Sequence, residues 1–276
     1  MIIRYVNSEG VEVILNKEPY KVLVSDLTDY DSAEVERNGK IACFTKEITE
    51  RDLNIDIISN SKEATQELCN KLNEVFEKDI YNDVAGKIYI NDYYMRCFIK
   101  SCKKSKRGNG VIRSYEYTLI TDYPFWIKET PYQYLPENPI SGGDSILTEG
   151  VMFPEFQFDF FRAKGDEILY NPSFADSNFI LAIYGFVENP QIAIAGHPYR
   201  VETTIYEGER LVIDSLTHTV QKIGRLGEIT NLYNARDKHY SVFKKIPPGM
   251  NTFQWSGGFG VDITLFDERS EPKWSL

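Results

Sequence analysis

The chain has 276 residues, of which 42% are hydrophobic and 26% charged, so we expect a folded protein with room for two domains of ordinary size. Its 31 basic and 41 acidic residues give a net charge of −10, which argues against general nucleic-acid binding and against attraction to anionic membranes. No apolar run reaches membrane-spanning length, and none follows Met1 as a signal sequence would, so we expect a protein made in the cytoplasm. The 16 Phe and 18 Tyr favour sheets.

Alternating apolar and polar residues predict several strands in the first part of the chain. The candidate strands are residues 2–6, 11–15, 20–24, 41–44 and 52–58. The first two flank a turn-rich tetrapeptide, residues 7–10, so we expect them to form a hairpin. In the last, Leu53, Ile55 and Ile57 share one face.

The hydrophobic period then changes. From Ser61 to Lys78, apolar residues recur at helical spacing, which predicts one amphipathic helix that packs on the sheet. The apolar positions are Ala64, Leu68, Leu72, Val75 and Phe76. Asn60 is the expected cap, and Glu63 stands at the third helical position, as in a capping box. Further strands are expected at 87–90, 93–102 and 111–121.

These elements predict a mainly-β protein whose first domain, 1–130, is α+β with one helix. Residues 131–155 are rich in Pro and Gly and are interpreted as a connection. The remainder, 156–276, is a succession of short alternating segments separated by turns, which is typical of a β-sandwich or jelly roll. Phe156, Phe158 and Phe160 begin that succession.

Candidate catalytic groups are sparse. His197, His218 and His239 lie far apart in sequence, and none stands beside a Ser or Cys nucleophile motif. Two acidic clusters could supply a glycosidase pair or calcium ligands, although solvated loops are the favoured interpretation. The clusters are Asp26, Asp29, Asp31, Glu34 and Glu36, and Asp262, Asp267, Glu268 and Glu271. The sequence therefore predicts no catalytic, cofactor-binding or metal-binding residues.

Three other features leave alternatives open. Cys43, Cys69, Cys97 and Cys102 are expected to be reduced thiols, although the last two flank a predicted hairpin, where a disulfide is geometrically possible. The basic turn 103–107 is either a solvated hairpin tip or a contact to an acidic neighbour, such as another copy of the chain. The aromatics Trp255 and Trp274 are either buried anchors or a saccharide-binding surface, and the glycines 257, 258 and 260 favour a bend.

Several segments, taken in order, resemble the distal tail protein family of long-tailed phages, the hub of the siphophage baseplate. In the first half they are residues 5–10, 51–58 with the helix that follows, 86–94 and 121–126. In the second half they are 170–172, 183–185, 189–190, 208–209 with 213–215, 246–251 leading to Trp255, and the closing segment 269–274. Their order, more than any single segment, carries the resemblance.

The resemblance implies an N-terminal domain that forms a homohexameric ring and a galectin-like or carbohydrate-module-like C-terminal sandwich. The implied partners are further copies of the chain, the major tail tube protein, a tail tip or tail-associated lysin protein, and receptor-binding proteins. DNA would pass through the ring without sequence recognition. The implied location is the virion tail of a phage or prophage, without enzyme activity or cofactor. The alternative function is that of an adhesion module recognising host cell-wall saccharide, and a carbohydrate-active enzyme is a third hypothesis.

Overall fold

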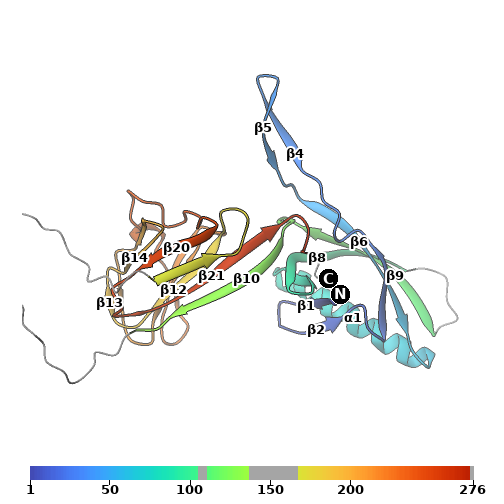
Figure 1. The fold of residues 1–276 in the computed structure, drawn as a ribbon. Helices are drawn as coiled ribbons and strands as arrows, with labels where there is room; N and C mark the ends of the chain where they lie inside the picture. The colour runs from blue at the N-terminus through green and yellow to red at the C-terminus, as the bar shows by residue number, and fades with distance from the viewer. Residues whose placement is uncertain (105–110, 137–166, 274–276) are drawn as a thin grey trace, which may run out of the picture. The chain divides into compact units, whose positions relative to one another are not determined.

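The computed structural model describes residues 1–104, 111–136 and 167–273 (Figure 1). They form mostly antiparallel strands and a single α-helix, so the predicted mainly-β class is confirmed. The chain divides into two compact units. Unit 1 comprises Met1–Lys128 and Glu268–Leu276, and unit 2 comprises Glu129–Asp267. The chain passes between them within two strands, β10 (Trp126–Tyr134) and β21 (Gly260–Arg269).

Two sets of strands in unit 1 meet at one long strand, β8. The strands are β1 (Ile3–Val6), β2 (Glu12–Ile14), β3 (Tyr20–Ser25), β4 (Ala33–Arg37), β5 (Lys40–Thr45), β6 (Thr49–Ile58), β7 (Gly86–Ile90), β8 (Tyr93–Lys104) and β9 (Ile112–Thr121). The first half of β8 pairs with β7, which continues through β1 to β2, and the second half pairs with β9, which continues through β6 to β3. The predicted strands are confirmed, but β4 was missed because its acidic residues favoured a solvated loop.

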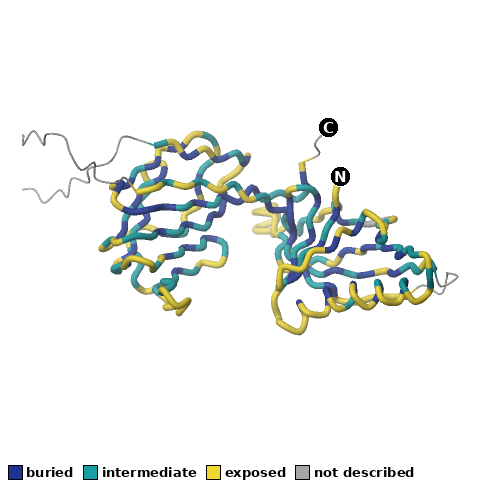
Figure 2. Tube along the Cα trace, turned by 90° about the horizontal axis from the view of Figure 1, so that it is seen from below, coloured by how far each residue is buried: buried dark blue, intermediate teal, exposed yellow. Residues whose placement is uncertain are grey.

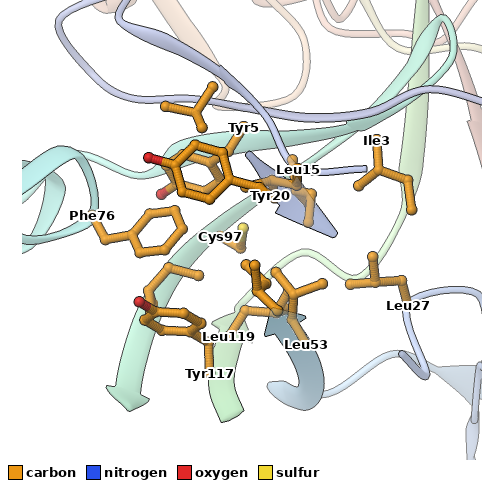
Figure 3. Close-up of a cluster of buried hydrophobic side chains, with 14 of the residues drawn as sticks. Ile3, Tyr5, Leu15, Tyr20, Leu27, Leu53, Phe76, Cys97, Tyr117 and Leu119 are labelled. Atoms are coloured by element: carbon orange, nitrogen blue, oxygen red, sulfur yellow. The ribbon is translucent and has the colours of Figure 1, made fainter. Parts of the chain in front are cut away.

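The core of unit 1 joins both sets of strands to the helix (Figure 3). The ring of Phe76 from the helix meets Tyr5 and Tyr117 edge-on, with ring centroids 4.8 and 5.1 Å apart. Edge-to-face pairs of this kind add to the free energy gained from burying aromatic surface. Leu53, Ile55 and Ile57 of β6 are all buried, as their alternation predicts. Figure 2 shows the same alternation of buried and exposed positions along many strands.

The helix α1 (Lys62–Asn82) contacts β6 and β8. Its cap is Ser61, whose hydroxyl accepts a hydrogen bond from the Ala64 N–H at 3.1 Å, so the prediction of Asn60 as the cap was wrong by one residue. The helix also extends past the predicted end at Lys78. The apolar stripe missed this last turn because its inward-facing residue is a buried carboxylate, Asp79.

Asp79 ties the end of the helix to the opening hairpin. Its carboxylate accepts hydrogen bonds from the Tyr5 hydroxyl and the Ser8 N–H, both at 2.6 Å. Burial raises the pKa of Tyr5 well above its usual range, so the phenol is the donor in this pair. Gly86 at the start of β7 leaves room for the contact, since a Cβ there would lie 2.3 Å from both the Tyr5 hydroxyl and the Asp79 carboxylate.

Unit 2 is a two-sheet sandwich. Its remaining elements are β11 (Glu167–Asn171), β12 (Phe179–Tyr184), β13 (Val187–Glu188), β14 (Gln191–Ile194), β15 (His197–Arg200), β16 (Thr204–Ile205), β17 (Arg210–Asp214), β18 (Thr219–Ile223), β19 (Ile229–Asn231), η1 (Tyr233–Ala235) and β20 (Gly249–Gln254). One sheet has the order β19-β18-β17-β12-β21 and the other β11-β20-β14-β15. Leu181 and Ile263 of the first sheet share a buried cluster with Phe253 and Ile192 of the second, as the predicted sandwich requires.

The expected connection lies mostly beyond the described residues. The strand β10 runs to Tyr134, past residue 131 where the connection is expected to begin, and Pro131 lies exposed within it. Tyr132 and Tyr134 pack against the core of unit 2. The predicted strand marked by Phe156 falls in 137–166, outside the described part of the chain.

Candidate assembly surface and binding groove

The three histidines make structural contacts. The Nε2 atom of His197 lies 2.9 Å from the Ser241 carbonyl oxygen, and its ring meets that of Tyr199 edge-on. His218 adopts a left-handed backbone conformation, and the backbone N–H of His239 donates to the Asp237 carboxylate. Over the described ranges, no group of three or more His, Cys, Asp or Glu side chains is arranged to hold a metal ion.

The first acidic cluster lies in the segment before β4 and on β4 itself. The Asp26 carboxylate accepts a hydrogen bond from the Asp52 N–H at 2.6 Å, and the Arg51 guanidinium donates to the carbonyls of Asp26 and Leu27. Burial lowers the pKa of Arg51 from its usual value. Lys46, the residue after β5, donates a hydrogen bond to the Asp31 carbonyl oxygen. Glu34 and Glu36 lie on β4 itself.

In the second cluster, Glu268 accepts a hydrogen bond from the Tyr123 hydroxyl at 2.7 Å, and Asp267 is buried. Asp262 receives the Tyr184 hydroxyl at 3.2 Å and lines a groove in unit 2. Glu271 follows β21 in a partly buried position. Of this cluster, Asp262 is therefore the residue placed on a candidate binding surface.

Trp255 is an anchor. It is 2% exposed, and its indole N–H donates to the Phe259 carbonyl at 3.0 Å across the glycine-rich bend between β20 and β21. The indole also stacks on Phe253. Trp255 is thereby removed as a saccharide-binding surface, and Trp274 lies outside the described residues.

The four cysteines are free thiols. The expectation that Cys97 and Cys102 flank a hairpin was wrong, because β8 runs through both. At a rise of about 3.3 Å per residue they lie about 16 Å apart along the strand, whereas a disulfide needs Cα atoms within about 7 Å. Lys103 and Lys104 of the predicted basic turn end the same strand, and the rest of that turn is outside the described residues.

The hairpin β4–β5 is the most exposed pair of strands in unit 1. Its turn, Asn38-Gly39, takes positive φ values of 53° and 69°, as two-residue hairpin turns require. Every residue of β5 is exposed, including Ile41 at 59% and Phe44 at 64%. Figure 1 shows the hairpin projecting from the rest of unit 1. Phe44 stands opposite Glu34, so the hairpin carries apolar side chains beside carboxylates.

The end of α1 forms a second exposed apolar surface. Ile80 and Val84 are exposed, and Tyr81 is 92% exposed. A shallow hollow of about 650 Å³ adjoins them, with Glu9 and Lys78 as an ion pair on its rim. Isolated exposed apolar residues are ordinary on a protein surface, but a group of them beside a hollow is typical of a contact surface.

A groove of about 1020 Å³ lies on the outer face of the β17-β12-β21 sheet in unit 2. Tyr184 of β12 is opposite Arg210 on one side and Gly260 on the other. A Cβ on Gly260 would lie 2.1 Å from the tyrosine ring, so this glycine lets the ring lie flat across β21. Burial, with the nearby Asp262 carboxylate, raises the pKa of Tyr184.

Loops at the rim extend the groove. Arg225 passes over Gly208, and its Nε–H donates to the Glu207 carbonyl at 2.6 Å. Glu209 forms an ion pair with Lys222 at 3.3 Å. The hydrogen bond that the Tyr206 backbone N–H donates to Glu209, helped by Lys222, lowers the pKa of Glu209. The groove therefore combines an aromatic ring with guanidinium and carboxylate groups.

Comparison with known proteins finds solved structures that have a similar fold. No family model matches the chain, and no curated protein matches it in sequence. The structure of the SPP1 Dit protein, described as a paradigm of the hub adsorption apparatus in phages infecting Gram-positive bacteria, matches with a TM-score of 0.58 at 9% identity and covers 98% of this chain and 100% of that one. A chain of the phage P2 baseplate in its activated conformation with Ca matches with a TM-score of 0.59 at 10% identity, covering 99% and 100% of the two chains.

A further chain, from the same baseplate in its activated conformation with Sr, matches with a TM-score of 0.59 at 12% identity and covers 98% of this chain and 99% of that one. The chain therefore has the fold of these hub and baseplate proteins, as the sequence resemblance implies. Over the described residues, no helix is long and apolar enough to span a bilayer.

The sequence interpretation missed the β4–β5 hairpin and the groove of unit 2. A signal for the hairpin was present, because Asn38-Gly39 between two short runs is a strong hairpin pattern. The groove had no such signal. Tyr184 and Gly260 are distant in sequence, and only the pairing of β12 with β21 brings them together.

Proposed function

We propose that this protein is a distal tail hub of a long-tailed phage or prophage and acts through contact surfaces, without catalysis. It forms a homohexameric ring that joins the tail tube protein to the tail tip or tail-associated lysin protein and to receptor-binding proteins. The observation that carries this proposal is the likeness to SPP1 Dit and to the phage P2 baseplate chain, which extends over 98 to 99% of the chain.

The hairpin β4–β5 is the surface we assign to the ring contact. A closed ring of identical chains needs two different complementary patches on each chain. A projecting hairpin with exposed apolar side chains supplies one such patch, because burying Phe44 and Ile41 against a neighbour removes apolar area from water. The carboxylates Glu34 and Glu36 on the paired strand add charge that restricts which neighbouring surface fits.

The mass of the particle in solution tests this function. Light scattering at micromolar concentration is expected to give about six times the chain mass of 31.9 kDa. Phe44→Asp places a charge in the proposed contact and is expected to lower the mass to that of one chain. Leu226→Asp is the matched control, because Leu226 is also exposed but lies in unit 2, and it should leave the mass unchanged.

A wild-type chain that stays a strict monomer even beside its adjacent tail proteins would contradict the hub function. A hexamer that survives Phe44→Asp would leave the hub function standing and remove the hairpin as the ring contact.

A further inference from the structure

We propose that the groove around Tyr184 in unit 2 binds a neutral saccharide. This site goes beyond the hub function, since a ring that joins tail parts needs no ligand on the sheet face of unit 2. The groove is formed by described residues of unit 2, from β12, β17, β18 and β21, the loops at their ends, and Pro136 after β10.

The ring of Tyr184 provides a platform. It lies flat because Gly260, its cross-strand neighbour, has no side chain, and a Cβ there would fall 2.1 Å from the ring. Its hydroxyl is held by the Asp262 carboxylate at 3.2 Å. Ala182, two positions earlier on the same face of β12, is small and keeps the floor beside the ring low. One face of the tyrosine is therefore covered by backbone, and the other lines the groove.

Charged side chains stand around this platform. The register puts Arg210 opposite Tyr184 on β17 and Asp262 opposite Ala182 on β21. A pyranose has a face of C–H groups that packs on an aromatic ring and a rim of hydroxyls that both donate and accept. A guanidinium donates to such hydroxyls and a carboxylate accepts from them, with charge-assisted strength.

The charges favour a neutral ligand. The lining carries two guanidinium groups, those of Arg210 and Arg225, and three carboxylates, those of Glu207, Glu209 and Asp262. Because Glu209 is ion-paired with Lys222, neither sign dominates the groove. A phosphate-rich or strongly acidic ligand would meet the three carboxylates at short range. A neutral hydroxyl-rich ligand meets no such repulsion and uses both kinds of group.

A peptide fits this place less well. Extended peptides bind at sheet edges, where unpaired backbone groups are available. The strand β12 at the groove floor is already paired on both sides, with β17 and with β21. A ligand on this face therefore finds no unpaired strand backbone on β12 and binds mainly through side chains, which suits a saccharide.

Titration calorimetry on the full chain tests the site, with four probes: cellotetraose, the tetramer of N-acetylglucosamine, a galactose tetramer and a rhamnose-containing tetrasaccharide. We expect at least one probe to bind with a dissociation constant of about 0.1 to 10 mM, as for a shallow site with one aromatic platform. Tyr184→Ala is expected to weaken that binding by about tenfold or more, the size of one lost aromatic contact.

Further variants separate the platform from a structural role. Tyr184→Phe keeps the ring and is expected to restore affinity to within about threefold of wild type, while Asp262→Asn weakens binding about tenfold by removing an ionised acceptor. Tyr170→Ala is the matched control: this tyrosine is exposed on β11, in the other sheet of unit 2, and its loss should change nothing. Thermal unfolding of each variant checks that the sandwich is intact.

The proposal is overturned if no probe binds at about 10 mM, or if binding persists unchanged in both Tyr184→Ala and Asp262→Asn. Because the groove lies in unit 2 and the ring contact in unit 1, either result leaves the hub function to be judged by particle mass alone.

Discussion

Two hairpins of unit 1 have the same kind of turn and pairing but differ in whether their side chains are buried. Both β4–β5 and β7–β8 are antiparallel pairs closed by a two-residue turn that begins with an asparagine at φ 53°, Asn38 in one and Asn91 in the other. In β7–β8 the opposed residues Ile88 and Met95 are completely buried. In β4–β5, Ile41 is exposed opposite Glu36.

The difference shows that a hairpin's local sequence specifies the turn and the pairing, whereas burial depends on what lies over its face. The helix and the strands of unit 1 form one core with β7–β8. None of the residues of β4–β5 belongs to the buried core clusters of the described chain. We therefore attribute the apolar residues of β4–β5 to contact with another molecule, and three matched pairs of residues, two compared by substitution and one by labelling, test this interpretation.

The isoleucine pair has the largest expected effect. Ile88→Ala removes a fully buried side chain and leaves a cavity, which should lower the free energy of unfolding by about 2 to 5 kcal/mol. Ile41→Ala changes an exposed position and should cost less than about 0.5 kcal/mol in the monomer. Urea unfolding, at a dilution where the chain is monomeric, compares the two. Equal losses would mean that β4–β5 packs on unit 1 after all.

The glycine pair has an intermediate effect. Gly86→Ala puts a methyl group against the Tyr5 hydroxyl and the Asp79 carboxylate, and overpacking of this kind should cost about 1 to 3 kcal/mol. Gly39→Ala meets no atom within 4 Å, and its cost of about 1 kcal/mol arises from the left-handed backbone alone.

Thermal unfolding measures both glycine variants. Asn91, which begins the other turn, supplies the control. Asn91→Gly relieves a left-handed position but removes the exposed hydrogen bond that the Ile2 N–H donates to the Asn91 side chain, so the two effects oppose each other and stability should stay within about 1 kcal/mol of wild type. A Gly39→Ala variant less stable than Gly86→Ala would contradict the open environment of the hairpin tip.

The third pair, Cys43 and Cys97, is compared by the rate at which each thiol is alkylated, and no substitution is needed. Cys43 on β5 is exposed and should be alkylated readily, while Cys97 is buried and should react only after unfolding. Burial raises the pKa of Cys97 to about 12, so the thiol stays protonated and unreactive when the pH is raised to about 9.

Mass spectrometry after timed alkylation locates the modified thiols. In assembled particles the labelling of Cys43 should slow, because its hairpin is then covered, while that of Cys102, exposed on β8, serves as the reference. Unchanged labelling of Cys43 on assembly would place the ring contact elsewhere.

The sequence by itself determined much of the local structure. Alternation located most strands, as in Leu53, Ile55 and Ile57, and the apolar stripe located the helix, because burial of one face imposes these periods on any chain. The hydrophobic pattern of the sequence did not locate the polar groups that face inward. The helix end was missed at Asp79, whose burial depends on donors from the opening hairpin.

The tertiary structure alone decided which side chains meet. Tyr184 becomes a platform because β21 brings Gly260 beneath it, and Trp255 becomes an anchor because the bend brings the Phe259 carbonyl to its N–H. Cys97 and Cys102 fall on one strand and cannot pair. The physical reason is the same in each case: periodicity records which face of an element avoids water, while a site depends on register between elements that are distant in the chain.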